Sequence, residues 1–211
     1  MRCNLFSIDI WKFKFPDLDH LARLSDHNLL STLGLVHLDY ISPAGLKTSA
    51  RSWERIPGND RIHDRDVFVP LRDFILEKSQ EVWNALDYYK DQTPKIYQSW
   101  VNVVDTGGFA LPHVHYNAAL SAVVYISAGP NQGNLIFEDP MELALCAQPL
   151  SRKTERMRRE IEVSTGDVVI FPGWIRHYTT TNQTTNQRIS FIANLNGTGE
   201  SFDPLAQGEH Q

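Results

Sequence analysis

Hydrophobic positions in the first 95 residues follow two different periods. Over residues 8–15 apolar and polar side chains alternate, with one break at Trp11, and this period of two predicts a β-strand. The apolar positions of this strand are Ile8, Ile10, Phe13 and Phe15. Leucines recur at helical spacing over residues 17–35, where Gly34 is placed to cap the end of a helix.

A long loop and a second helix are predicted next. Residues 40–62 are rich in Ser, Pro, Gly and charged side chains, which is typical of a loop. Residues 67–86 carry the clearest helical pattern in the chain, because their apolar side chains form a single stripe. That stripe consists of Val69, Leu71, Phe74, Ile75, Val82, Trp83 and Leu86.

Beyond about residue 95 the pattern changes to short strands separated by turn signals. The predicted strands cover residues 96–104, 120–126, 133–137, 161–163, 166–171, 174–180 and 188–195. Such a series predicts an all-β sandwich or barrel, and we expect a jelly-roll, mainly β with N-terminal helices. We expect one domain over residues 1–211, with supporting elements in 1–95, the jelly-roll core in 96–196 and a polar tail in 197–211.

Composition and charge narrow the class of protein. Hydrophobic residues make up 42% of the chain and charged residues 21%, which is ordinary for a soluble globular protein. The net charge of -5 argues against a general nucleic-acid binder. Two cysteines, Cys3 and Cys146, exclude a disulfide framework and indicate a reducing compartment. Without a signal-peptide pattern or an apolar run of about 20 residues, we expect a cytoplasmic protein.

Three histidines form the most informative candidate site. His113 and His115 are two positions apart, so on an extended strand both side chains project from the same face. His177 follows much later and has to come from a different strand. Three neutral nitrogen donors are suitable for iron, zinc or copper, so spacing alone leaves the metal open. The remaining five histidines have no such organisation.

An arginine near the third histidine adds a candidate anion site. Arg188 lies on the next predicted strand after His177, and its planar fork grips carboxylates bidentately. Ser190, two residues on, points to the same face and can add a hydroxyl group. These residues predict a pocket that holds a metal together with an anionic co-substrate.

The order of these residues resembles the Fe(II)/2-oxoglutarate-dependent dioxygenases, whose fold is a double-stranded β-helix, a form of jelly-roll. More narrowly, the chain is similar to a family of 2OG-Fe(II) oxygenases found in bacteria and their phages. Six segments carry this resemblance in order: residues 99–102 (SWVN), 111–117 (LPHVHYN), 120–126 (LSAVVYI), 133–140 (GNLIFEDP), 166–172 (GDVVIFP) and 188–194 (RISFIAN). Residues 1–95 match only in general layout.

The resemblance implies roles for individual residues. It makes His113 and His177 iron ligands and makes Arg188, assisted by Ser190, the holder of the distal carboxylate of 2-oxoglutarate. It makes three further residues contacts of the co-substrate: Asn102, Tyr125 and Asn194. The catalytic set is then His113, His115, His177 and Arg188, acting with Fe(II), 2-oxoglutarate and O2.

His115 departs from the family pattern, in which its position holds Asp or Glu. Three explanations stay open. His115 itself ligates the iron as a third histidine, which we favour because its side chain is already on the correct face. Alternatively it leaves a position open to an anion, as in halogenating relatives that lack the carboxylate. In the third explanation Glu138 or Asp139, on a neighbouring strand, supplies the negative charge.

The reaction that the resemblance implies is hydroxylation of an unactivated C–H bond with release of succinate and CO2. One rival is a cupin-type dioxygenase, in which three histidines hold iron without 2-oxoglutarate. Another rival is a non-enzymatic β-sandwich that binds a partner. The substrate, small or macromolecular, stays unidentified, and the chain is compatible with a homodimer. The basic stretch in residues 141–160 is a candidate for substrate choice.

Overall fold

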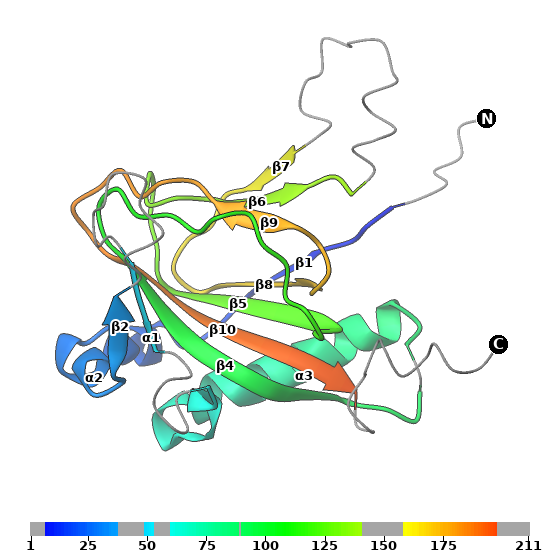
Figure 1. The fold of residues 1–211 in the computed structure, drawn as a ribbon. Helices are drawn as coiled ribbons and strands as arrows, with labels where there is room; N and C mark the ends of the chain where they lie inside the picture. Colours follow the sequence, from blue (N-terminus) through cyan, green and yellow to red (C-terminus); the bar gives the residue numbers. More distant parts are fainter. Residues whose placement is uncertain (1–6, 38–48, 53–59, 89, 141–157, 198–211) are drawn as a thin grey trace, which may run out of the picture.

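The structure is a computed structural model that describes residues 7–37, 49–52, 60–88, 90–140 and 158–197. Two antiparallel sheets lie face to face, a large one and a small one (Figure 1). The large sheet has the order β1 (Trp11–Lys14), β8 (Asp167–Pro172), β5 (Leu120–Ser127), β10 (Arg188–Gly197), β4 (Pro94–Val104), β3 (Ser49–Ser52) and β2 (Leu35–His37). The small sheet has the order β7 (Arg158–Ile161), β6 (Leu135–Glu138) and β9 (His177–Thr179). The expected jelly-roll with N-terminal helices is confirmed.

Helices cover the outer face of the large sheet, on the side away from the small sheet (Figure 1). They are α1 (Leu18–Leu24), α2 (His27–Ser31) and α3 (Val69–Ala85), with 3-10 turns at Ile62–Asp64 and Asp66–Phe68 before α3. The predicted stripe of the long helix is confirmed, because Leu71, Ile75, Val82 and Trp83 are all buried. Within the described ranges, no helix has both the length and the apolar character needed to cross a membrane.

One continuous helix over residues 17–35 is wrong. The chain forms two short helices, because Asp26 accepts hydrogen bonds from the backbone N–H groups of Asn28 and Leu29 and so begins a new helix. Asp17 caps α1 in the same way, through the N–H of His20. Local capping therefore outweighs a leucine spacing that is continuous through the break.

Several predicted boundaries also differ. The first strand begins at Trp11, so the inward face carries Trp11, Phe13 and Phe15, and Ile8 is exposed. The expected loop over residues 40–62 contains β3, although much of it lies outside the described residues. Strand β7 ends at Ile161 instead of beginning there, and β9 begins only at His177. Residues 141–157 and 198–211 lie outside the described ranges, so the basic stretch and the tail stay predictions.

The large sheet separates two hydrophobic cores, and β10 shows how. Its odd-numbered residues from Ile189 to Leu195 pack under the helices, because side chains alternate across a strand. Its even-numbered residues face the small sheet, and they are Arg188, Ser190, Ile192 and Asn194. Ile192 packs there in the second core, with Trp100 and Tyr125. The polar positions of this inner face therefore lie between the sheets, in a position to form a site.

The buried carboxylate of Asp167 on β8 contacts side chains of the edge strand β1. Asp167 accepts hydrogen bonds from the Ser164 N–H at 2.7 Å and pairs with Lys12 at 3.0 Å and Lys14 at 3.1 Å. Burial acts to raise the pKa of Asp167, but the hydrogen bonds from Lys12, Ser164 and Lys14 outweigh it, so the pKa lies below its ordinary value.

Removing this carboxylate should destabilise the fold in a pH-dependent way. We expect Asp167→Ala to lower the free energy of unfolding by about 1–3 kcal/mol at pH 7. A carboxyl with a lowered folded pKa stabilises above its unfolded pKa of about 3.9 and loses that effect as pH falls through the folded pKa. Urea unfolding should therefore show the two proteins converging below about pH 4. Lys12→Met, which removes one exposed partner, should cost about 0–1 kcal/mol. A pH-independent difference would contradict the assignment.

Candidate metal and co-substrate site

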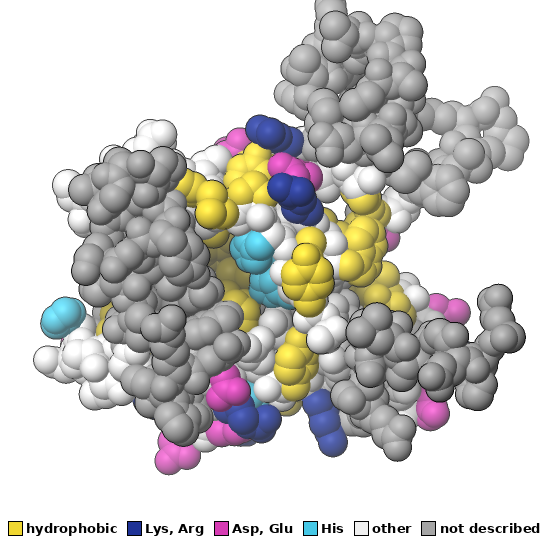
Figure 2. Space-filling view, in the orientation of Figure 1, with side chains coloured by type: hydrophobic (Ala, Val, Ile, Leu, Met, Phe, Trp, Pro, Cys, Tyr) yellow, Lys and Arg dark blue, Asp and Glu magenta, His cyan; other side chains and the backbone are white. Residues whose placement is uncertain are grey.

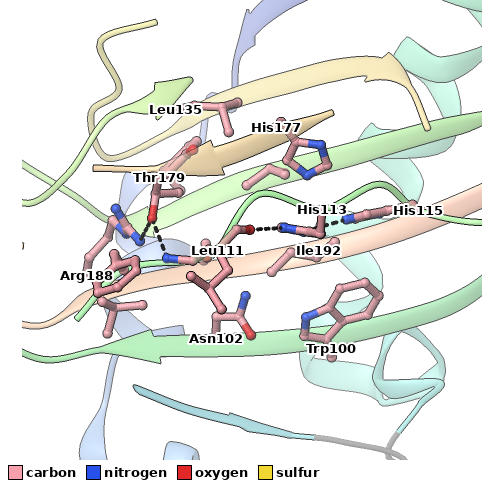
Figure 3. Close-up of a pocket in the computed structure, with 16 residues that line it drawn as sticks. Trp100, Asn102, Leu111, His113, His115, Leu135, His177, Thr179, Arg188 and Ile192 are labelled. Carbon is pink, nitrogen blue, oxygen red and sulfur yellow. Dashed lines mark hydrogen bonds between the residues drawn. The ribbon is translucent and has the colours of Figure 1, made fainter. Parts of the chain in front are cut away.

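A cavity of about 270 Å³ opens between the two sheets. The surface of the histidines lies in a hollow bordered by hydrophobic side chains (Figure 2). The three imidazoles lie toward one end of the cavity, and Arg188 and Thr179 lie toward the other (Figure 3). The lining residues are Trp100, Asn102, Val104, Phe109, Ala110, Leu111, His113, His115, Val123, Tyr125, Leu135, His177, Thr179, Arg188, Ser190 and Ile192. The predicted histidines and arginine therefore share one pocket.

The backbone holds the histidines together. His113 and His177 form an isolated bridge, in which each N–H donates to the other's carbonyl at 2.9 and 3.0 Å. The N–H of His115 donates to the Gly173 carbonyl at 2.9 Å. A Cβ at residue 173 would collide with the Ala118 carbonyl, so the close approach of Gly173 to Ala118 requires glycine. His113 and His115 lie on this bridged segment and not on a regular strand, which corrects the expectation.

Hydrogen bonds decide which nitrogen each histidine offers to the pocket. His113 Nδ1 lies 2.6 Å from the Leu111 carbonyl, and His177 Nδ1 lies 2.9 Å from the Ile175 carbonyl. A carbonyl only accepts, so both Nδ1 atoms carry the proton and both Nε2 atoms keep a lone pair. His115 Nδ1 likewise lies 2.5 Å from Asn194 Oδ1, which leaves its Nε2 free as well.

Nitrogen atoms of the three imidazoles converge. One nitrogen from each of the three histidines lies within 4.8 Å of the others, and the Nε2 atoms of His113 and His115 are 3.3 Å apart. Two lone pairs at that distance repel unless a cation lies between them. Burial, with smaller effects from neighbouring groups, lowers the pKa of His115 to about 4 and that of His177 to about 2, so both are neutral at pH 7. Neutral imidazoles are the form that binds metals.

Arg188 is a buried cation at the far end of the pocket, with 3% of its surface exposed. Its Nη1 donates to the carbonyls of Gln132 and Gly133 at 3.1 and 2.9 Å, and its Nη2 donates to Thr179 Oγ1 at 3.0 Å. Gly133 has a φ of +97°, and a Cβ there would collide with Nη1. Burial lowers the pKa of Arg188 from its ordinary value. No carboxylate within the described ranges pairs with this guanidinium.

Three of the predicted co-substrate contacts form one row beside Arg188. Ser190 on β10 pairs in register with Asn102 on β4 and with Tyr125 on β5, and all three line the cavity. Burial raises the pKa of Tyr125 to about 12, so its hydroxyl stays a hydrogen-bond donor at pH 7. Asn194 does not line the cavity and lies behind His115. Its contact with the co-substrate stays a prediction.

The acidic alternative for the third ligand is not part of the cluster. Glu138 forms an ion pair with Arg176 at 2.9 Å, and neither Glu138 nor Asp139 lines the pocket. Among the described residues, the group with metal-binding geometry consists of the three histidines alone.

Several residues that line the pocket were not predicted from the sequence, although strand alternation could have identified some of them. Thr179 follows His177 by two on β9, and Trp100 precedes Asn102 by two on β4, so strand alternation places each on the same face as its neighbour. Leu111 and Phe109 come from an irregular segment that carries no such signal.

Three aromatic side chains on or beside the core strands, Phe171, Phe191 and Trp174, differ in what they contact. Phe171 packs against the His177 ring with centroids 4.7 Å apart. Phe191 faces the opposite core, where it stacks on Phe68, and Trp174 is 53% exposed. One of the three therefore shields the histidines.

Comparison with known protein families and structures agrees with this geometry. Residues 98–194 match the family described as "Putative 2OG-Fe(II) oxygenase". No curated protein matches the sequence. HygX from Streptomyces hygroscopicus, solved with nickel and 2-oxoglutarate bound, is 13% identical with a TM-score of 0.59 over 90% of this chain and 84% of that one. A Pseudomonas putida prolyl-4-hydroxylase is 12% identical with a TM-score of 0.60 over 89% and 92%.

A third similar structure is the epimerase SnoN from nogalamycin biosynthesis, solved with Fe3+, alpha ketoglutarate and nogalamycin RO. It is 15% identical with a TM-score of 0.60 over 89% of this chain and 78% of that one. At such identities these structures show a shared fold, and the family match covers the segments that contain the histidines and Arg188. Through residues 98–194, which include the three histidines and Arg188, the chain is similar to the 2OG-Fe(II) oxygenases.

Proposed function

We propose that His113, His115 and His177 bind one Fe(II) through their Nε2 atoms, and that Arg188 and Ser190 bind the distal carboxylate of 2-oxoglutarate. The observation that carries this proposal is the buried Arg188 guanidinium, which has no carboxylate partner in the described part of the chain and shares a cavity with three clustered imidazoles. A buried charge without a counter-ion is costly, and a dicarboxylate removes that cost.

The other polar residues of the cavity orient the co-substrate. Tyr125 and Asn102 lie on either side of Ser190, so the polar row crosses three adjacent strands in the cavity wall. Thr179 accepts from Arg188 and from the Ala110 N–H, and in this way it holds the guanidinium fork in place. Apolar side chains of Val123, Leu135 and Ile192 exclude water from the space between.

We propose that the reaction is hydroxylation of an unactivated C–H bond in a small or macromolecular substrate. Iron and 2-oxoglutarate, when bound, supply the oxidising chemistry, which converts 2-oxoglutarate and O2 to succinate and CO2. The chain's own contribution is to hold the two groups in register and to exclude water. Two similar structures are named as a hydroxylase and an epimerase, so proteins with this fold carry out different reactions. Hydroxylation is therefore a more specific proposal than the binding of iron and 2-oxoglutarate.

A second function receives support from one observation. Three neutral histidines are also the ligand set of thiol dioxygenases that bind iron without 2-oxoglutarate, and His115 suits that class. A thiol dioxygenase binds no 2-oxoglutarate, so it would have no use for the buried Arg188. The polar row of Ser190, Asn102 and Tyr125 would have no role there either. We therefore favour the 2-oxoglutarate-dependent reaction.

Calorimetry and gas uptake test the proposal. We expect 2-oxoglutarate to bind the Mn(II)-loaded protein and to bind far more weakly without metal. The reason is that the metal held by the histidines and the Arg188 guanidinium would both contact the same 2-oxoglutarate molecule. In the Fe(II)-loaded protein, O2 consumption and succinate formation should both require 2-oxoglutarate. Oxygen consumption that is independent of 2-oxoglutarate, in the presence of a small thiol such as cysteine, would instead favour the thiol dioxygenase.

A further inference from the structure

A row of three polar side chains, two of them buried and one half-buried, lies next to His115. Asn194 on β10 pairs in register with Ser121 on β5 and with Gln98 on β4, so the row crosses three adjacent strands. Ser121 is fully buried and Asn194 is 4% exposed. Polar groups in such surroundings persist when they are hydrogen-bonded to one another, and a complete network fixes a single arrangement.

The hydrogen bonds of this row have a definite direction. Asn194 Nδ2 donates to Gln98 Oε1 at 3.1 Å, which turns Asn194 Oδ1 toward His115. That oxygen accepts from Ser121 Oγ at 2.9 Å and lies 2.5 Å from His115 Nδ1. Ser121 Oγ also lies 2.7 Å from His115 Nδ1. With Asn194 Oδ1 as the common acceptor, Nδ1 of His115 has to carry the proton.

His115 differs from the other two histidines in what holds it. Main-chain carbonyls fix the rings of His113 and His177, and substitution cannot remove those acceptors. Side chains fix the ring of His115. Of the three histidines, His115 is therefore the one whose ring orientation can be changed by substituting a neighbouring side chain.

We propose that Asn194, supported by Ser121, is the positioning residue that makes His115 a neutral metal ligand through Nε2. The inference rests on the proposed function for the metal itself. It gives Asn194 a role beside His115 instead of a contact with the co-substrate. The amide supplies an acceptor without adding a charge, so the ligand set stays neutral.

The first test needs no metal. In ¹⁵N-labelled, metal-free protein, long-range ¹H–¹⁵N spectra distinguish the protonated from the unprotonated ring nitrogen of each histidine. We expect all three rings to carry the proton on Nδ1 in the wild type. In Asn194→Leu, His115 should lose that preference, whereas His113 and His177 should keep it. Those two rings serve as the internal control for an intact fold.

Metal affinity provides the second test. We expect Asn194→Leu to weaken Co(II) binding by about 10- to 100-fold, the range for loss of an outer-shell partner. Asn194→Asp retains the acceptor, because the Gln98 amide can rotate to donate, and should restore affinity to within a few fold of the wild type. Ser121→Ala should have a smaller effect than Asn194→Leu. Gln98→Leu, which leaves the contact between Asn194 and His115 in place, should have the smallest.

The outcomes separate this inference from the function on which it rests. A wild type that fails to bind Co(II) would overturn the metal site. A wild type that binds Co(II) but carries the His115 proton on Nε2 would overturn the inference alone. Unchanged Co(II) affinity in Asn194→Leu would do the same, and so would a failure of Asn194→Asp to rescue while its His113 and His177 signals are intact.

Discussion

Arg188→Met is expected to weaken 2-oxoglutarate binding by about 100-fold or more. Removing one partner of a buried charge pair costs about 3–5 kcal/mol, and each 1.4 kcal/mol is a factor of ten. The guanidinium is 3% exposed and has no carboxylate partner in the described ranges, so a bound dicarboxylate would be its counter-ion. Calorimetric titration of 2-oxoglutarate into the Mn(II)-loaded variant measures the change.

Matched variants identify the cause of that loss. Arg188→Lys keeps the charge without the planar fork, so its affinity should fall between those of Arg188→Met and the wild type. Arg176→Met removes an exposed arginine that pairs with Glu138 outside the pocket and should bind 2-oxoglutarate normally. Co(II) affinity should persist in Arg188→Met, because Arg188 does not contact the imidazoles. Wild-type 2-oxoglutarate affinity in Arg188→Met would show that another group holds the carboxylate.

His177→Ala is expected to eliminate metal binding at micromolar concentrations. His177 is buried, is neutral at pH 7 and bridges by its backbone to His113, so it lies at the centre of the cluster. Loss of an outer-shell partner costs about 10- to 100-fold in metal affinity, and loss of a ligand itself should exceed that range. Competition with a chromophoric chelator for Co(II) measures the affinity.

The control for this variant is His27→Ala, which removes an exposed histidine on α2 that does not line the pocket. Its Co(II) affinity should equal that of the wild type. A backbone bridge between residues 113 and 177 does not require the imidazole, so His177→Ala should keep the fold and its far-UV circular dichroism. Tight Co(II) binding by a folded His177→Ala protein would place the metal elsewhere.

The strands of the core could be predicted well because their residues satisfy local and tertiary preferences at once. β4, β5, β8 and β10 combine β-branched residues with burial, and all four appear close to the expected positions. Elements with weaker local signals were misjudged. Asp26 divides a leucine-rich segment into two helices, and β3 owes its existence to pairing with β4, a contact that no local pattern reveals.

The site could be predicted in part for the same reason. His177 and Arg188 could be predicted from their order in the sequence. Ser190 could be predicted because strand alternation places it on the same face as Arg188. Asn194 also obeys that alternation, but it lies against His115 and does not line the cavity. The role of Glu138 could not be read either, because its pairing with Arg176 depends on how β6 and β9 meet.

By itself, the sequence determined a jelly-roll with three candidate metal-binding histidines and one candidate anion-binding arginine, because alternation and residue chemistry are local properties. Only the tertiary structure decided which nitrogen His115 presents, that Arg188 has no carboxylate beside it in the described residues, and that Asn194 contacts His115. These properties depend on hydrogen bonds and burial between segments up to about 80 residues apart, such as the 79 between His115 and Asn194, and chain spacing does not encode them.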